Sequence, residues 1–280
     1  MKKIIACIKP NPPLVYFVNQ VHRAFPLHTV VVEDKSLGKR SFLDRMKARA
    51  AMGAEAPVRA HVPVRVRKKT MAARYTKILG RDWLDLDRSL PVVYCRNIND
   101  EVVETLLAKE KPDLLLDHGT SIVKERIFEK AMLTLNLHWG LSPYYRGTHC
   151  TEWALINWDP YNIGVTVHRL AGKIDGGEVL CQSRVDIEPH DTVDSINMKL
   201  TREGTKILIE ALKIWHAGLG LDFYPQDYSQ GCLTLNRQWN RQLRKVVQGI
   251  EKNGLIAEML KTPARRERLP IVRLRSCPEA

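Results

Sequence analysis

Strand patterns and helical patterns alternate along this chain, and the alternation constrains the fold more than any other feature. Residues 3–8 and 27–33 are apolar strand patterns, and residues 14–22 between them have apolar side chains at helical spacing. A strand, a helix and a second strand in this order are typical of an open parallel sheet. Further strand patterns follow at residues 91–95, 113–117, 133–138, 164–170 and 179–185, and helical patterns at residues 100–110, 123–130 and 192–216. The sequence predicts an α/β fold, a mostly parallel central sheet flanked by helices.

Length and composition limit the class of protein. The 280 residues, 44% of them hydrophobic, are enough for a sizeable core. No apolar run approaches the roughly 20 residues that a membrane span needs. The apolar part of the first ten residues is too short for a signal peptide and reads better as a first strand. The six cysteines are scattered without a C-x-x-C pair, so we expect reduced thiols and a cytoplasmic protein.

The net charge of +13 is distributed unevenly. In residues 35–81, which we interpret as a basic insertion, only Asp44 and Glu55 oppose a long series of Lys and Arg. Residues 42–52 within it are expected to form a basic amphipathic helix. A second basic block covers residues 237–275. Such charge fits a phosphorylated substrate, a nucleic acid or peripheral contact with an anionic membrane, and equally a solvated face that keeps the protein in solution.

The turn after the first strand argues against one common class of α/β enzyme. It reads Lys-Pro-Asn-Pro-Pro over residues 9–13, with no glycine. The backbone amides that cradle a dinucleotide phosphate are therefore not supplied, which excludes an NAD dehydrogenase. Residues 118–121, by contrast, follow a buried strand at its carboxyl end. Ligands of open α/β sheets bind in that position.

Three polar residues near strand ends suggest chemistry at a carbonyl group. Asn136 and His138 are two apart on one strand, so their side chains share a face, and Asp175 lies on a glycine-containing loop after a later strand. An amide donor can stabilise an oxyanion, an imidazole can move protons, and a carboxylate can orient the imidazole. No Ser or Cys nucleophile is needed if an amine attacks. An Asn and a His two apart are, however, most often structural when nothing else supports them.

Two other interpretations of the same region were weighed. His138 and His149, with Cys150 and Asp175, could be drawn as a metal site, but their spacing does not match a zinc motif, and we predict no metal. Cys150 has no base beside it in the sequence, and we interpret it as a packed thiol.

Residues 136–147, Asn-Leu-His-Trp-Gly-Leu-Ser-Pro-Tyr-Tyr-Arg-Gly, resemble the N-x-H-x-S-L-L-P-x-Y-R-G signature of the folate-dependent formyltransferases. That family includes methionyl-tRNA, glycinamide ribonucleotide and sugar N-formyltransferases. Blocks at residues 153–157, 164–167 and 174–180 also resemble family blocks in the same order, and the likeness extends from about residue 92 to residue 216. Two positions depart from the signature: Gly140 replaces its Ser, and Ser142 replaces its second Leu.

The resemblance implies a formyltransferase fold, with residues 1–216 as the catalytic domain and residues 217–280 as a short basic C-terminal extension. It implies transfer of a formyl group from N10-formyltetrahydrofolate to an amine, without a metal. Asn136 and His138 would stabilise the oxyanion, and Asp175 would support His138 and assist proton transfer. The residues that would contact the cofactor are Gly119, Thr120, Ser121, Ile122, Val123, Gly172 and Ile174. Those assigned to the acceptor are Trp139, Tyr145 and Arg146.

Within the family, the sequence favours a nucleotide-linked amino sugar as the acceptor. Glycinamide ribonucleotide fits poorly, because Pro12 and Pro13 replace the glycine-rich phosphate loop of those enzymes. Methionyl-tRNA suits the basic charge, but the extension after residue 216 is short for the C-terminal barrel of the tRNA enzymes. A hydroxyornithine-type amine remains an alternative acceptor. A basic nucleic-acid-binding module with a decayed, inactive formyltransferase core remains an alternative to the enzyme.

Overall fold

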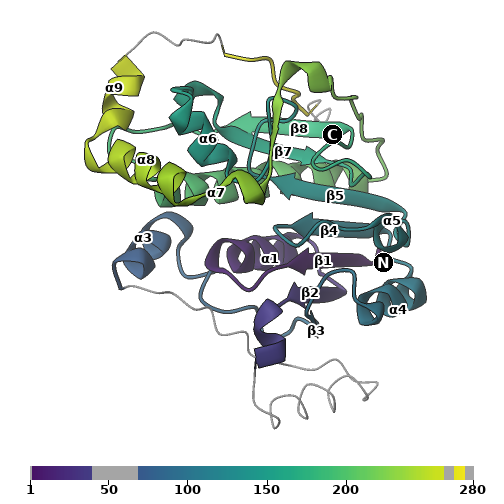
Figure 1. Ribbon diagram of the computed structural model, residues 1–280. Helices are drawn as coiled ribbons and strands as arrows, with labels where there is room; N and C mark the ends of the chain where they lie inside the picture. The colour runs from purple at the N-terminus through teal and green to yellow at the C-terminus, as the bar shows by residue number, and fades with distance from the viewer. Residues whose placement is uncertain (1, 40–68, 262–267, 275–280) are drawn as a thin grey trace. The chain divides into compact units, whose positions relative to one another are not determined.

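The computed structural model describes residues 2–39, 69–261 and 268–274, and the chain forms two compact units, Met1–Asn136 and Leu137–Ala280 (Figure 1). The division falls inside strand β5 (Leu133–His138). Only the two ends of the predicted basic insertion are described. The helix expected at residues 42–52 lies outside the described residues.

The first unit contains parallel strands in the order β3 (Val92–Cys95), β2 (Thr29–Glu33), β1 (Ile4–Ile8), β4 (Leu114–His118) and β5. Every residue of β1, β2 and β4 is buried. Parallel strands covered on both faces have continuous apolar sequences, which explains why these segments do not alternate apolar and polar residues. The predicted α/β class with a mostly parallel sheet is confirmed.

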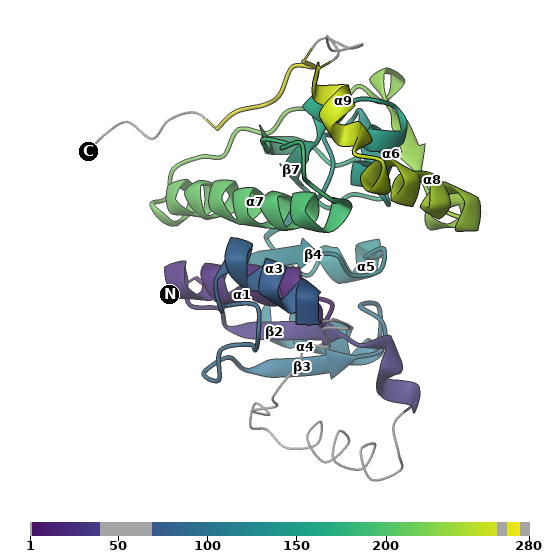
Figure 2. The same cartoon turned by 90° about the vertical axis from the view of Figure 1, so that its left-hand side faces the viewer.

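Among the described residues of the first unit, the α-helices are α1 (Pro12–Ala24), α3 (Lys69–Leu79), α4 (Glu101–Glu110) and α5 (Glu125–Phe128). The proline-rich turn after β1 is the start of α1. Asn11 caps it by accepting a hydrogen bond from the Leu14 N–H, and the prolines occupy the first turn, where they cost no helical hydrogen bond. Figure 2 shows α3 next to α1, which it contacts.

One polar side chain on the buried face of α1 organises the loop before β3. Asn19 is 5% exposed. Its Nδ2 donates to the backbone carbonyls of Asp82 and Asp85, both at 2.7 Å, and its Oδ1 accepts from the Asp87 N–H at 2.9 Å. Asn19 thus satisfies three backbone groups of a loop that has no strand or helix of its own.

The described part of the second unit contains two pairs of strands and four α-helices. β7 (Gly164–His168) pairs antiparallel with β8 (Val179–Arg184), and β6 (Tyr145–Gly147) pairs parallel with β9 (Cys232–Thr234). The helices are α6 (Cys150–Ile156), α7 (Val193–His216), α8 (Arg241–Lys252) and α9 (Leu255–Lys261). None of the described helices has the length and apolar character to cross a bilayer.

Helix α7 confirms the prediction at residues 192–216 almost residue for residue. Thr192 and Ser195 form a reciprocal capping box at its start, and its apolar face is buried against β7 and β8. At Gly204 the helix comes so close to Leu137 that an added Cβ would lie 2.7 Å from the leucine Cδ1. This close packing holds the strand residue that precedes His138.

The other boundaries differ where the signal is short. Helix α5 is limited to Glu125–Phe128 instead of the predicted residues 123–130. Strands β6 and β9 have three residues each and were not predicted, because a three-residue strand shows no recognisable period.

Replacement of Asn19 tests the role given to this side chain. Asn19→Leu leaves two carbonyls and one N–H of the loop without their partner, so the free energy of unfolding should fall by about 2–4 kcal/mol. Gln20→Ala, next to it, removes a single bond to the Asp82 side chain and should cost less than about 1 kcal/mol. Denaturant titrations of both variants give the comparison. Equal losses would contradict the assignment.

Candidate active site

The candidate site of the second unit begins at the end of β5. Asn136 and His138 are 9% and 7% exposed and, two apart on one strand, they share a face. Asn136 is the last residue of the first unit and His138 belongs to the second. After His138 the chain runs through residues 139–147, here called the signature loop, which ends in β6.

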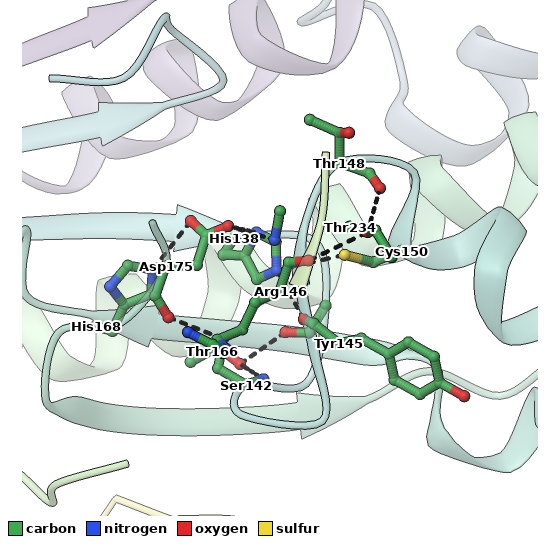
Figure 3. Close-up of polar contacts among 12 residues, drawn as sticks. His138, Ser142, Tyr145, Arg146, Thr148, Cys150, Thr166, His168, Asp175 and Thr234 are labelled. Carbon is green, nitrogen blue, oxygen red and sulfur yellow. Dashed lines mark hydrogen bonds and ion pairs between the residues drawn. The ribbon is translucent and has the colours of Figure 1, made fainter. Parts of the chain in front are cut away.

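Asp175 lies between two imidazole rings (Figure 3). Its Oδ2 is 3.5 Å from Nδ1 of His138, and its Oδ1 is 3.6 Å from Nε2 of His168. The Gly147 N–H donates to Oδ2 at 2.7 Å. The backbone of Asp175 is left-handed, with φ of 45°, a conformation that a non-glycine residue keeps only when its surroundings hold it there. The structure thus brings His138 and Asp175 together, as the sequence predicts.

In each ring, the nitrogen that does not face Asp175 hydrogen-bonds to a backbone carbonyl. Nε2 of His138 lies 3.0 Å from the Tyr145 carbonyl oxygen, and Nδ1 of His168 lies 2.7 Å from the Arg169 carbonyl oxygen. Because a carbonyl oxygen only accepts, each of these nitrogens carries the hydrogen. In the neutral His138 ring, Nδ1, which faces Asp175, is therefore the nitrogen with the lone pair, whereas a hydrogen bond from His168 helps to keep Asp175 ionised. A proton taken up at Nδ1 of His138 is held directly against the carboxylate.

Burial and charge set the ionisation of the pair. Burial lowers the pKa of His138 below its ordinary value; Asp175 opposes this shift, and the charge of His168 adds to it. Burial alone would raise the pKa of Asp175, but the charges of His138 and His168 and the Gly147 hydrogen bond lower it well below the usual range. At neutral pH the site consequently holds an ionised Asp175 beside a His138 that can accept a proton.

Gly140, the first departure from the signature, makes room for His138. A Cβ at this position would lie 2.4 Å from Nε2 of His138, 2.5 Å from the Tyr145 carbonyl oxygen and 3.0 Å from Sγ of Cys150. The serine usual in the family has no space here. Cys150 is buried as expected, and burial raises the pKa of its thiol well above the ordinary value. The sequence did not reveal that Cys150 lies beside His138. In the structure its Sγ is 3.6 Å from Nε2 of that ring.

Ser142, the second departure, belongs to a buried network that fixes the signature loop. Its N–H donates to Oγ1 of Thr166 at 3.0 Å, and its carbonyl accepts from Nε2 of Gln182 at 2.6 Å. Thr166 in turn donates to the Gly140 carbonyl at 2.7 Å. The loop before β6 is thereby attached to both β7 and β8.

The three residues assigned to the acceptor have different surroundings. The Tyr145 hydroxyl donates to buried Asp159 at 2.8 Å, and its ring points away from Asp175 in Figure 3, so only its backbone carbonyl faces His138. Arg146 is 8% exposed, and its guanidinium lies 4.6 Å from the centre of the Tyr228 ring. Within the described residues this guanidinium has no carboxylate partner. Trp139 is half-buried.

The turn assigned to the cofactor at residues 119–123 lies in the first unit. Buried Glu33 accepts from both the Ser121 N–H and its hydroxyl, each at 2.6 Å, and Thr120 donates to Asp117 at 2.5 Å. Ile122, next along the turn, is 66% exposed. Glu33 and Asp117 thus hold the turn in place through hydrogen bonds, and the turn exposes the apolar side chain of Ile122. Gly172 and Ile174 lie in the second unit, on the loop of Asp175.

Sequence reasoning missed several groups around Asp175. His168, buried at the end of β7, was given no role, although its place just before the Asp175 loop was a usable signal. Gly147, Gln226 and Tyr228 left no signal, because backbone donors and residues in patternless segments are invisible to periodicity. No group of three or more His, Cys, Asp or Glu within the described part of the chain is arranged to hold a metal ion.

Comparison with known proteins agrees with this geometry. Residues 50–212, more than half of the chain, match the formyl transferase family, and the chain belongs to that family. It is 38% identical over 129 residues to the bifunctional polymyxin resistance protein ArnA of Wigglesworthia glossinidia brevipalpis, a match covering 45% of this chain and 20% of that protein. It is 33% identical over 156 residues to a methionyl-tRNA formyltransferase of Chloroflexus aggregans, covering 53% and 48%. The chain spans less than half the length of these relatives.

Solved structures share the fold at low sequence identity. An N-formyltransferase of Helicobacter canadensis, in complex with folinic acid and dTDP-3-aminofucose, superposes with a TM-score of 0.56 at 15% identity, covering 86% of this chain and 73% of that one. A sugar N-formyltransferase of a Shewanella species superposes with a TM-score of 0.54 at 15% identity, covering 89% and 87%. At this identity the likeness supports the formyltransferase fold alone.

Gly140→Ser restores the family residue and tests the space argument. The side chain should displace His138 and lower the free energy of unfolding by about 1–3 kcal/mol, the usual cost of overpacking. Gly220→Ser is the matched control, because nothing lies within 4 Å of a Cβ there. Denaturant unfolding of both variants distinguishes the two sites. A Gly140→Ser protein as stable as the control would contradict the geometry.

The lowered pKa of His138 predicts a pH dependence of stability. Between the folded pKa and the unfolded value of 6.5, the unfolded chain binds more protons at this residue than the folded one. The contribution of His138 is therefore fully present above pH 6.5 and is lost as the pH falls toward the folded pKa. Unfolding free energies from pH 5 to 8 should fall less steeply toward acid in His138→Gln than in the parent protein. Parallel profiles would show that His138 does not titrate as a buried group.

Proposed function

We propose that this protein transfers a formyl group from N10-formyltetrahydrofolate to a primary amine. The observation that carries the proposal is the Asp175 carboxylate fixed beside Nδ1 of His138 at the end of the strand that also bears Asn136. Membership of the formyl transferase family supports the same reaction. Asn136, His138 and Asp175 would then be the catalytic residues.

The geometry of His138 suits the proton transfer that such a reaction needs. An amine that attacks a formyl carbon becomes positively charged and must lose a proton. Nδ1 of His138 is the free acceptor, because Nε2 is committed to the Tyr145 carbonyl. Asp175 stabilises the protonated ring. The positive charge of the ring and the Asn136 amide would stabilise the oxyanion formed on the formyl oxygen, and the proton held by the ring would go to the folate nitrogen that leaves when the oxyanion collapses.

The residues assigned to the cofactor offer an apolar side chain in the first unit and accessible backbone in the second. When bound, the folate supplies a formyl group already activated on nitrogen. In the first unit, the braced turn presents Ile122 as an apolar surface, while the donors of Ser121 are taken by Glu33, so Ser121 supports the turn instead of binding directly. In the second unit, Gly172 has open space around its Cα, so its backbone is accessible to a ligand.

For the acceptor we propose the amino group of a nucleotide-linked amino sugar. The guanidinium of Arg146, which has no carboxylate partner in the described part of the chain, and the net charge of +13 suit an anionic acceptor. The Helicobacter canadensis neighbour is described in complex with a dTDP-linked amino sugar. Methionyl-tRNA is the second candidate, since several curated relatives, at 29–34% identity, are methionyl-tRNA formyltransferases.

A thermal melt with 5-formyltetrahydrofolate, a stable analogue of the donor, tests the cofactor first. At 100 times the dissociation constant the ligand should stabilise the folded protein by about 2.7 kcal/mol. Formyl transfer is then measured with a panel of amines: nucleotide-linked amino sugars, methionyl-tRNA and a hydroxyornithine. Asn136→Ala, His138→Ala and Asp175→Ala should each lower kcat by about a hundredfold or more while the analogue still stabilises the protein.

The outcomes separate the parts of the proposal. Stabilisation by the analogue with transfer to methionyl-tRNA alone would replace the sugar acceptor but keep the reaction. Absence of both stabilisation and transfer, together with salt-sensitive binding of RNA, would favour the inactive nucleic-acid-binding module. Near-parental kcat in the His138→Ala protein would remove His138 from the mechanism.

A further inference from the structure

A segment beyond the family match crosses both loops of the site. The match ends at residue 212, whereas residues 223–234, here called the 223–234 segment, contact first the loop of Asp175 and then the signature loop. At its start, Tyr224 pairs with Val179 through two backbone hydrogen bonds of 2.8 and 2.9 Å. This anchors the segment to β8, immediately after the Asp175 loop.

Two side chains of the segment hold three successive carbonyls of that loop. Nε2 of Gln226 donates to the carbonyl of Asp175 at 2.9 Å and to that of Gly177 at 2.6 Å. The Tyr228 hydroxyl donates to the carbonyl of Gly176 between them. A left-handed backbone at a non-glycine residue is strained, and these bonds oppose its relaxation together with the Ser142 hydroxyl, whose Oγ lies 3.5 Å from the Asp175 carbonyl oxygen. The direction of the Asp175 side chain follows from this backbone.

The same segment fixes the second group that touches the Asp175 carboxylate. β9 pairs with β6, so that Gly147 faces Thr234, and Oγ1 of Thr234 donates to the carbonyls of Arg146 and Thr148 (Figure 3). Gly147 has φ of 95°, and an added Cβ would lie 1.9 Å from the Thr234 carbonyl oxygen. β9 therefore determines where the Gly147 N–H points, and that N–H binds Asp175.

The Tyr228 ring also joins the two loops by contact with cations. The guanidinium carbon of Arg146, on the signature loop, lies 4.6 Å from the ring centre, and Nζ of Lys173, on the Asp175 loop, lies 4.5 Å from it. Both distances are within the range of cation–π attraction. One residue of the segment thus contacts both loops and donates to the backbone beside Asp175.

We propose that Gln226 and Tyr228 are positioning residues that aim the Asp175 carboxylate between His138 and His168. They act through the backbone of residues 175–177 and touch no reacting atom. The proposal rests on the formyl transfer proposed above for its effect on kcat, but its structural content stands on the hydrogen bonds alone. It gives part of the predicted C-terminal extension a role in the site.

Two variants test the proposal, with a control from the same segment. Tyr228→Phe removes only the hydroxyl, and Gln226→Met removes both donated bonds at similar volume. Gln230→Ala is the control, because Gln230 is exposed and its side chain binds Asp227 alone. The readouts are kcat and KM for formyl transfer, and the pH titration of the His138 ring followed by NMR. The charged and titratable groups facing that ring are Asp175, His168, Arg146 and Cys150.

We expect kcat to fall by about tenfold to a hundredfold in both variants, with KM little changed, because a displaced catalytic group slows the chemical step. The His138 titration should move to lower pH, because a displaced Asp175 no longer stabilises the protonated ring. Gln230→Ala should match the parent in every readout. If the Gln226→Met protein does not fold, the kcat and the His138 titration of Tyr228→Phe alone test the proposal.

Parental kcat and a parental His138 titration in both variants would overturn the proposal. A parent protein inactive with every amine would refute the proposed function instead. In that case the His138 titration still decides whether Gln226 and Tyr228 position Asp175.

Discussion

The largely buried carboxylate of Asp175, whose side chain is 13% exposed, is the group on which the arrangement of the second unit depends. An ionised carboxylate largely removed from water is costly unless charges and hydrogen bonds replace its solvation. Here they come from the ends of three strands: His138 at the end of β5, His168 at the end of β7 and the Gly147 N–H at the end of β6. Each lies on a different element, so the carboxylate holds these elements together electrostatically.

The loops around this carboxylate approach so closely that side chains are excluded at specific points. Gly140 leaves room for the His138 ring and the Cys150 thiol, and Gly147 lies against the Thr234 carbonyl. Such contacts restrict the conformation of the backbone and hold the His138 ring and the Gly147 N–H in fixed positions. They also explain why this chain departs from the family signature at residue 140. The difference is a matter of space around the histidine, and the pair of His138 and Asp175 is retained.

Periodicity predicted the fold class and the long elements well. The buried runs of β1, β2 and β4 and the amphipathic stripe of α7 carry their signal within one segment, so no other part of the chain was needed to find them. Elements β6 and β9 were missed, because each has only three residues and forms through its partner. The pairing of His138 with Asp175 was predicted through the resemblance to formyltransferases; the residue spacing by itself left it open.

The sequence by itself determined that strands alternate with helices and that Asn136 and His138 share one strand face, because both follow from local geometry with a fixed period. The tertiary structure alone decided that His168 also faces Asp175, that Cys150 lies against His138, and that Gln226 and Tyr228 hold the backbone of the Asp175 loop. All but one of those contacts join residues 12 to 52 positions apart, and the exception, His168 with Asp175, joins the end of a strand to the loop that follows it. Which residues meet in these contacts depends on the path of the chain in space, and a local sequence pattern carries no information about that path.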